Sequence, residues 1–127
     1  PAAFNQALEY LCGVDGRFSA VFGLNDFYAD GRDISWIWDI NMELLHTVER
    51  RIDRIIVFGS RYADMALRLK YAGIAEDKLV LVSGCDCKKV EDLIREAGGS
   101  VYILPTYTAM LQLRRKLVNA RGTRFWG

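Results

Sequence analysis

Short apolar runs alternate along this chain with segments in which apolar residues recur every three or four positions. The runs predict buried β-strands, and they comprise residues 18–24, 55–58, 79–82 and 101–104. The periodic segments predict helices, and they comprise residues 4–11, 61–71, 87–97 and 106 to about 119. A further short helix is expected around His46, where Met42, Leu45 and Val48 have helical spacing.

Residues at the ends of these segments support the assignment. Ser60, Asp86 and Thr106 each stand where a side chain could cap the first turn of a helix. Glycines follow the periodic segments and favour helix ends, as at Gly13 and Gly73. Strands that alternate with amphipathic helices are typical of a parallel sheet covered on both faces. We therefore expect an α/β domain, with three Rossmann-like layers and a mainly parallel sheet.

Length and composition fit one such domain. The chain has 127 residues, of which 51% are hydrophobic and 26% are charged, as in ordinary globular proteins. No apolar run approaches the roughly 18 residues of a membrane-spanning helix, and no signal peptide is recognisable. Because the chain opens with Pro1 rather than Met, we expect it to be a fragment of a longer protein.

The charge distribution and the cysteine content indicate which partners and which cellular compartment to expect. Residues 97–127 carry five basic side chains and no acidic one, although the whole chain has a net charge of only +1. Such a segment could face an anionic partner or an acidic neighbouring domain. Nucleic acid is the less favoured partner, because few stacking aromatic residues accompany the basic ones. Three cysteines do not form a secreted disulfide pattern, so we expect a reducing cytoplasm.

Candidate chemistry belongs at the carboxyl ends of the predicted strands, where ligands of parallel sheets bind. Four loops follow those strands, and they comprise residues 25–33, 59–61, 83–86 and 105–108. The turn at 59–61 could hold a phosphate through free N–H groups, or it could be a simple capped turn. No phosphate-binding loop sequence is present, which argues against ATP hydrolysis by this chain alone. Cys85 and Cys87 lack the histidines that a zinc site would need, so no metal site is expected.

The first of these loops is the most unusual segment. Four carboxylates and two tryptophans lie within residues 25–39, together with only one basic side chain. Acidic residues this close repel each other unless they bind a cation, accept N–H bonds or face a basic partner. In the simpler interpretation, Asp26 and Asp30 are turn and capping residues, and Trp36 and Trp38 are core. Both interpretations remain open from the residues alone.

Four segments together make the chain resemble the C-terminal domain of MurT proteins. The segments are Pro1–Gln6, the Asp-x-Ser-Trp-x-Trp-Asp motif within 25–39, the Ala66–Ala72 helix, and Leu104–Leu111. The resemblance extends over essentially the whole chain in order, and it implies a fold like that of the Mur ligase C-terminal domain. Residues 1–127 would then form that one domain, without the N-terminal and central ATPase part of the longer chain.

The resemblance also implies a function. MurT is the Mur-ligase-like subunit of lipid II isoglutaminyl synthase, and it pairs with GatD, a glutamine amidotransferase-like subunit. ATP activates the α-carboxylate of D-glutamate in the peptidoglycan stem peptide, and ammonia from glutamine converts it to D-isoglutamine. ATP and Mg²⁺ would be bound mainly by the missing central domain, and no cofactor is expected in this domain alone. The enzyme would act in the cytoplasm, on the lipid-linked precursor at the inner membrane face.

In this family the C-terminal domain is thought to supply an acidic residue to the glutaminase site. Motif position assigns that role to Asp39, with Asp33 as the second choice. Another group of residues would line the face that closes over ATP, magnesium or substrate. The stronger candidates for that face are Asn25, Asp26 and Asp30, and the weaker ones are Arg61, Thr106 and Thr108.

Two alternatives stay open at this stage. The domain could be an interaction module that only docks the glutaminase subunit, with its acidic residues serving structure alone. It could also be a free-standing α/β domain that binds a nucleotide or a sugar, which tight ATP binding by this chain would favour.

Overall fold

A parallel β-sheet forms the centre of the molecule. The computed structural model describes residues 2–117 and 123–125. Its sheet has five strands in the order β3-β2-β1-β4-β5, and every neighbouring pair is parallel. The strands are β1 (Phe18–Gly23), β2 (Ile52–Phe58), β3 (Leu79–Leu81), β4 (Ser100–Pro105) and β5 (Thr123–Phe125).

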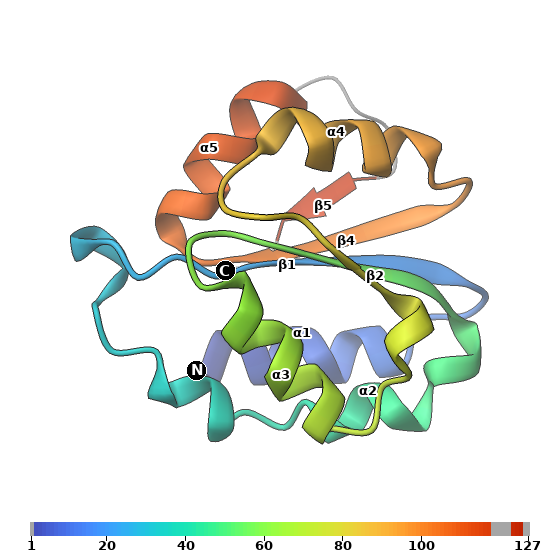
Figure 1. Cartoon of the computed structure of the whole chain (residues 1–127). Helices are drawn as coiled ribbons and strands as arrows, with labels where there is room; N and C mark the ends of the chain where they lie inside the picture. The colour runs from blue at the N-terminus through green and yellow to red at the C-terminus, as the bar shows by residue number, and fades with distance from the viewer. Residues whose placement is uncertain (1, 118–122, 126–127) are drawn as a thin grey trace.

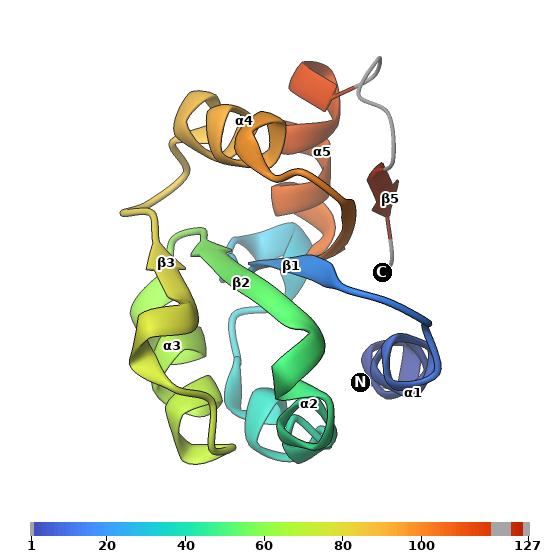
Figure 2. The ribbon, with the colours of Figure 1, turned by 90° about the vertical axis from the view of Figure 1, so that its right-hand side faces the viewer.

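Helices cover both faces of this sheet, which gives three layers (Figure 1). One layer contains α1 (Ala2–Cys12), α2 (Glu43–Thr47) and α3 (Tyr62–Tyr71), and the other contains α4 (Cys87–Glu96) and α5 (Tyr107–Leu117). Figure 2 shows the two layers on opposite sides of the strands. Four short 3₁₀ turns complete the described chain: η1 (Tyr28–Asp30), η2 (Ser35–Trp38), η3 (Glu49–Arg51) and η4 (Glu76–Lys78).

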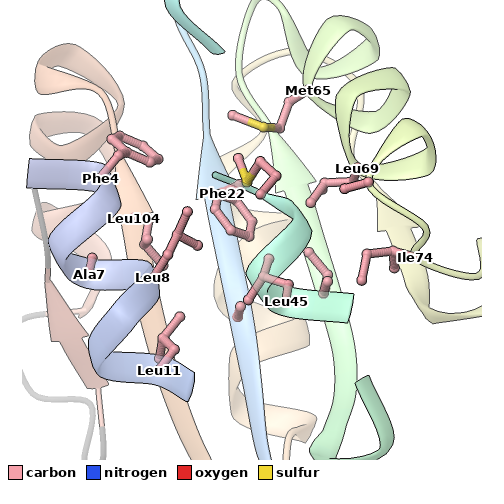
Figure 3. Packing of buried hydrophobic residues seen from close by; sticks show 14 of the residues in the cluster. Phe4, Ala7, Leu8, Leu11, Phe22, Leu45, Met65, Leu69, Ile74 and Leu104 are labelled. Carbon is pink, nitrogen blue, oxygen red and sulfur yellow. The ribbon is translucent and has the colours of Figure 1, made fainter. Parts of the chain in front are cut away.

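Alternating side chains of the central strands build two separate hydrophobic clusters. Phe22 of β1 points into the cluster under α1, α2 and α3, where Figure 3 shows it among Leu8, Leu45 and Met65. Its neighbour Val21 points the other way, into the cluster under α4 and α5. Each fully buried side chain of this size contributes about 1.5–3 kcal/mol relative to an exposed one. The period-two alternation therefore holds a helical layer on each face.

The sequence-based fold class is confirmed, and most predicted boundaries lie within a few residues of the observed ones. Asp86 is an N-cap as predicted, since its carboxylate accepts a hydrogen bond from the Lys89 N–H. The predicted Ser60 cap is wrong: α3 has Arg61 at its N-cap position and no side-chain cap. Strand β5 and the 3₁₀ turns were not predicted. The last two residues of the predicted final helix, 118 and 119, lie outside the described residues.

The strand order determines where a ligand site can form. The connections from β1 to β2 and β3 cover one face of the sheet, whereas those through α4 and α5 cover the other. The order therefore reverses between β1 and β4, and the crevice at such a reversal is the usual ligand position in parallel sheets. Among the residues described, no helix is long and apolar enough to cross a membrane.

Candidate functional site

Asn25 joins all four loops at the carboxyl edge of the sheet. Asn25 lies two residues after the end of β1, and it is completely buried. The amide Nδ2 donates to Thr108 Oγ1 at 2.9 Å and to Gln112 Oε1 at 3.2 Å. The amide Oδ1 accepts from the Ser60 N–H at 2.8 Å and from the Cys85 thiol at 3.4 Å. The nitrogen and the oxygen of this amide are therefore both engaged in hydrogen bonds that hold the edge together. Asn25, which was expected to face a ligand, thus has a structural role here.

Backbone contacts bring the same loops together. The Asn25 N–H donates to Thr106 Oγ1 at 3.0 Å, so the hydroxyl of Thr106 is also engaged. Gly59 follows β2 with a φ of +109°, and its N–H donates to the Gly84 carbonyl. A Cβ at position 59 would lie only 2.3 Å from the Leu24 carbonyl oxygen. Only glycine fits there without a shift of the backbone.

Asp26 forms a small network with the start of α3. The Ser60 hydroxyl donates to Asp26 Oδ1 at 3.0 Å, and Arg61 Nη1 donates to Asp26 Oδ2 at 3.2 Å. These hydrogen bonds, that from Ser60 first, lower the pKa of the Asp26 carboxyl. Arg61 also donates through Nε to Asp64 at 2.8 Å. The Ser60 oxygen also accepts from the Asp26 N–H at 3.1 Å, so this hydroxyl is bonded to the loop after β1 and not to the first turn of α3.

Asp30 caps α5, the helix that follows β4. Its Oδ1 accepts from the Thr108 N–H at 2.7 Å, and its Oδ2 accepts from the Thr108 hydroxyl at 2.5 Å. A carboxylate at a helix N-terminus satisfies a free backbone donor and interacts favourably with the helix dipole. This contact fits the capping interpretation of Asp30, and it ties the loop after β1 to the helix after β4.

A pocket of about 420 Å³ opens beside Asp30, at the reversal between β1 and β4. Its walls are mainly apolar, and two carboxylates lie among the lining residues: Ala3, Phe4, Ala29, Asp30, Asp33, Trp36, Pro105, Thr106, Tyr107 and Met110. Asp33 accepts from the Ser35 N–H at 2.9 Å, and that bond lowers the pKa of its carboxyl. The pocket could hold a small ligand that combines an apolar body with a polar or cationic group.

Asp39 is not part of this network of loop residues. It follows η2 directly, and its side chain is exposed. Its N–H donates to the Trp36 carbonyl at 3.0 Å, but within the described part of the chain its carboxylate has no hydrogen-bond or ion-pair partner. The structure therefore brings Asn25, Asp26, Asp30, Arg61, Thr106 and Thr108 into one network, with Asp33 at the neighbouring pocket. Asp39 is presented to solvent.

Arg68, which the sequence analysis missed, holds the backbone on both sides of Asp39. It lies on α3, and only 3% of the residue is exposed. Its Nε donates to the Ile37 carbonyl at 2.7 Å, and its Nη2 donates to the Ile40 carbonyl at 2.8 Å. The guanidinium also pairs with Glu43 and lies 5.3 Å from the ring centroid of Trp38. A signal was available, because position 68 falls on the apolar stripe of α3 with Met65, Leu69 and Ala72.

The remaining candidates carry little chemistry. Burial raises the pKa of the Cys85 thiol, which disfavours the reactive thiolate. Among the described residues, no group of three His, Cys, Asp or Glu side chains could hold a metal ion. Trp36 is half-buried against the core, whereas Trp38 is 45% exposed, so the core interpretation holds only for the first tryptophan.

The fold and the loop network define a doubly wound α/β domain with a pocket at its strand reversal and an exposed carboxylate, that of Asp39, outside the network. The profile of the MurT ligase C-terminal family matches residues 1–110. The chain therefore belongs to this family. It is 33% identical over 124 residues to the lipid II isoglutaminyl synthase (glutamine-hydrolyzing) subunit MurT of Streptococcus pneumoniae, which covers 98% of the chain.

A second relative gives the same result. The subunit of the same name from Staphylococcus aureus is also 33% identical, over 117 residues or 92% of the chain. The chain spans about a quarter of the length of these relatives, 27% and 26% respectively.

Proposed function

We propose that this chain is the C-terminal domain of a MurT subunit of lipid II isoglutaminyl synthase and that it supplies Asp39 to a GatD-like glutaminase subunit. The similarity to glutamine-hydrolysing synthase subunits supports the proposal. In the proposed reaction, the longer subunit uses ATP to activate the D-glutamate α-carboxylate of the lipid II peptide. Ammonia from the glutaminase then converts the carboxylate to the amide, in the cytoplasm at the inner membrane face.

One observation carries the assignment to Asp39: its carboxylate is exposed while Arg68 fixes the carbonyls of Ile37 and Ile40 on either side. A glutaminase Cys–His pair needs a third group that orients the imidazole and stabilises its cationic form. A carboxylate can serve from another subunit only if it is exposed and held in place. The single histidine of this chain, His46, pairs with Glu49, so the imidazole is expected from the partner.

Asp33 is the second choice for the same role. Its carboxylate already accepts a hydrogen bond from the Ser35 N–H, and it lines the pocket at the strand reversal. A residue placed there is better suited to contact a substrate of this domain than a partner's active site. The pocket and Asp33 therefore join Asn25, Asp26 and Asp30 on the face proposed to close over the ligase substrates.

ATP and Mg²⁺ are proposed to be bound mainly by the part of the longer subunit outside this chain. The candidates here are already bonded to one another: Asp26 pairs with Arg61, and Asp30 accepts hydrogen bonds from both the N–H and the hydroxyl of Thr108. Oxygen ligands for Mg²⁺ would have to come mostly from substrate phosphates and other residues. The role left to this edge is to form a rigid wall against the nucleotide or the peptide.

The test measures glutamate release by the glutaminase subunit, alone and with the longer MurT subunit that contains this chain. Asp39→Asn should lower the stimulated kcat at least about 100-fold, the scale of a lost acid–base partner, while complex formation survives. Asp33→Asn is the matched control and should keep glutaminase activity. Wild-type glutaminase activity in Asp39→Asn would overturn the assignment, and activity lost only in Asp33→Asn would transfer the role to Asp33.

The alternative function is a docking module without a catalytic group. The aromatic side chains exposed beside Asp39 favour it as the second candidate. In that case Asp39→Asn would weaken complex formation and glutaminase activity together, and saturating amounts of the variant would restore full activity. Titration of the glutaminase with each variant separates the two functions.

A further inference from the structure

The pocket at the strand reversal has two carboxylates in its lining, those of Asp30 and Asp33, and no described lysine, arginine or histidine lines it. The start of α5 partly balances the charge of Asp30, which accepts from the Thr108 N–H. Asp33 is exposed, and its Oδ1 accepts from the Ser35 N–H. A carboxylate has about four acceptor sites, so Asp33 keeps some of them for a ligand. Its neighbour Arg32 forms no ion pair within the described part of the chain.

An aromatic wall accompanies these carboxylates. Trp36 and Phe4 both line the pocket, and their ring centroids are 5.1 Å apart. Phe4 also stacks on Phe22 of β1, so the wall is continuous with the hydrophobic core. Tyr107, which is 55% exposed, lines the pocket from the first turn of α5. Aromatic rings pack well against an alkyl chain, and their faces also attract cations.

These two features together select one class of ligand. Although the first turn of α1 borders the pocket, a phosphate bound there would lie beside Asp30 and Asp33, whose charges repel it. A divalent cation needs several oxygen ligands, and no group of three acidic, His or Cys side chains among the described residues could hold one. A wholly apolar ligand would take the carboxylates out of water without compensation. An alkyl stem that ends in a positive charge satisfies both the wall and the carboxylates.

We propose that this pocket is a subsite for an ammonium-bearing side chain of the peptide on which the ligase acts, and that Asp33 determines its specificity. The inference rests on the proposed function, in which this edge of the sheet faces the peptide substrate. The alkyl stem would lie against Phe4 and Trp36, and the ammonium would lie at Asp33. A site that bonds a charged group discriminates strongly against a ligand that lacks the charge, because its own polar group is then left unpaired.

The remaining polar groups favour a peptide over a simple alkylamine. The Trp36 Nε1–H and the Tyr107 hydroxyl have no hydrogen-bond partner among the described residues. Such groups require acceptors when a ligand covers them, and a peptide supplies backbone carbonyl oxygens. The pocket volume of about 420 Å³ is also in the range of sites that hold a ligand larger than one amino-acid side chain.

The first experiment measures, by NMR titration, the Kd of the longer MurT subunit for two probes, Nα-acetyl-lysine amide and Nα-acetyl-norleucine amide. Norleucine has the same alkyl stem without the ammonium. The norleucine probe should bind at least about fivefold more weakly, because it loses both the ion pair and the cation–π contact. Added salt should reduce this difference. Equal Kd values for the two probes, or no binding of the lysine probe, would overturn the proposal.

Asp33→Asn should raise the Kd of the lysine probe at least about threefold, a modest effect because Asp33 is exposed. It should leave the norleucine probe unaffected, since the amide oxygen can still accept from the Ser35 N–H. Asp15→Asn is the matched control: it removes the same charge from an exposed residue that precedes β1, at the opposite edge of the sheet. Equal weakening of both probes by Asp33→Asn would reduce Asp33 to a structural role and refute the subsite.

A second measurement separates the subsite from the proposed function on which it rests. In the complete complex, acetylation of the ammonium on a peptide acceptor should raise the KM for amidation at least about threefold, and Asp33→Asn should abolish that difference. A preference for the free ammonium that persists in Asp33→Asn would overturn the assignment to Asp33. Absence of amidation with every acceptor would refute the proposed function, whereas the Kd values of the two probes would still decide whether the pocket binds an ammonium group.

Discussion

Arg68 and Glu43 form a two-pronged ion pair, with Nη1 3.0 Å from Oε2 and Nη2 2.9 Å from Oε1. The pair is asymmetric, because 4% of the Arg68 side chain is exposed but 55% of the Glu43 side chain. The buried member also donates to two backbone carbonyls, those of Ile37 and Ile40. One guanidinium therefore connects α3 to the segment that carries Asp39 and to the start of α2.

Arg68→Met should lower the free energy of unfolding by about 2–4 kcal/mol, because it removes the donor of the buried Ile37 carbonyl and leaves the Ile40 carbonyl with the Met42 N–H alone. Arg68→Lys should recover only part of this loss, since an ammonium cannot reproduce the planar arrangement of donors. Urea unfolding measures both variants. Lys70→Met is the control: Lys70 pairs with Glu76 on the surface, and its loss should cost no more than about 1 kcal/mol. Equal effects of Arg68→Met and Lys70→Met would contradict the structural role given to Arg68.

The stabilisation by Glu43 should depend on pH. The hydrogen bond from Arg68 lowers the pKa of the Glu43 carboxyl, whereas an unfolded chain has a glutamate pKa of about 4.3. The stabilisation is therefore complete above about pH 4.3 and is lost as the pH falls through the folded-state pKa. Urea unfolding of wild type and Glu43→Gln between acidic and neutral pH should give a difference that shrinks toward low pH. A constant difference would show that the charge of Glu43 does not stabilise the fold.

Asn25→Ala should lower the free energy of unfolding by about 1–3 kcal/mol. It removes one buried amide and leaves the Ser60 N–H without its acceptor. Asn25→Asp should also destabilise the fold, because Oδ would replace the Nδ2 donor that faces Gln112 Oε1. Asn41→Ala is the control, since Asn41 is exposed and should change stability by less than about 0.5 kcal/mol. Equal melting temperatures for Asn25→Ala and Asn41→Ala would refute the central role of Asn25.

Gly59→Ala should be more damaging than Gly16→Ala, although both glycines have positive φ values of +109° and +81°. The two substitutions share the backbone strain of an L-residue in this region, of order 1–3 kcal/mol. Only at position 59 would the new Cβ also meet a backbone atom, the Leu24 carbonyl oxygen, whereas nothing lies within 4 Å at position 16. Chemical denaturation should therefore give a clearly lower free energy of unfolding for Gly59→Ala than for Gly16→Ala. Equal losses would mean that the loop shifts freely.

The sequence was sufficient to predict the sheet and the edge at which the loops gather. Strands β2 and β4 contain the continuous apolar runs 55–58 and 101–104, which are typical of a sheet buried on both faces. Strand β5 could not be predicted in this way, because Thr123–Phe125 is short and has no apolar run. The 3₁₀ turns escaped for a similar reason, since three or four residues show no period.

The sequence was sufficient to predict which residues lie near the candidate site, but not which contacts they make there. The sequence places Asn25 after β1, yet only the fold shows that its amide is buried and bonded to three other loops. Ser60 had two possible partners, the helix that follows it and the acidic loop before it, and local pattern cannot choose between them. Asp39 could be named from a motif, but the backbone on either side of it is held by Arg68, which is 29 residues further along the chain.

The connection between β1 and β2 is fastened to both helical layers. Asp30 holds it to α5, which covers one face of the sheet, through Thr108. The Ile37 carbonyl holds it to α3, which covers the other face, through Arg68. The stretch between these two anchors therefore bridges the sheet edge like a strap. Any sliding of one helical layer against the other would change the span of that strap, and with it the pocket wall at Asp33 and Trp36.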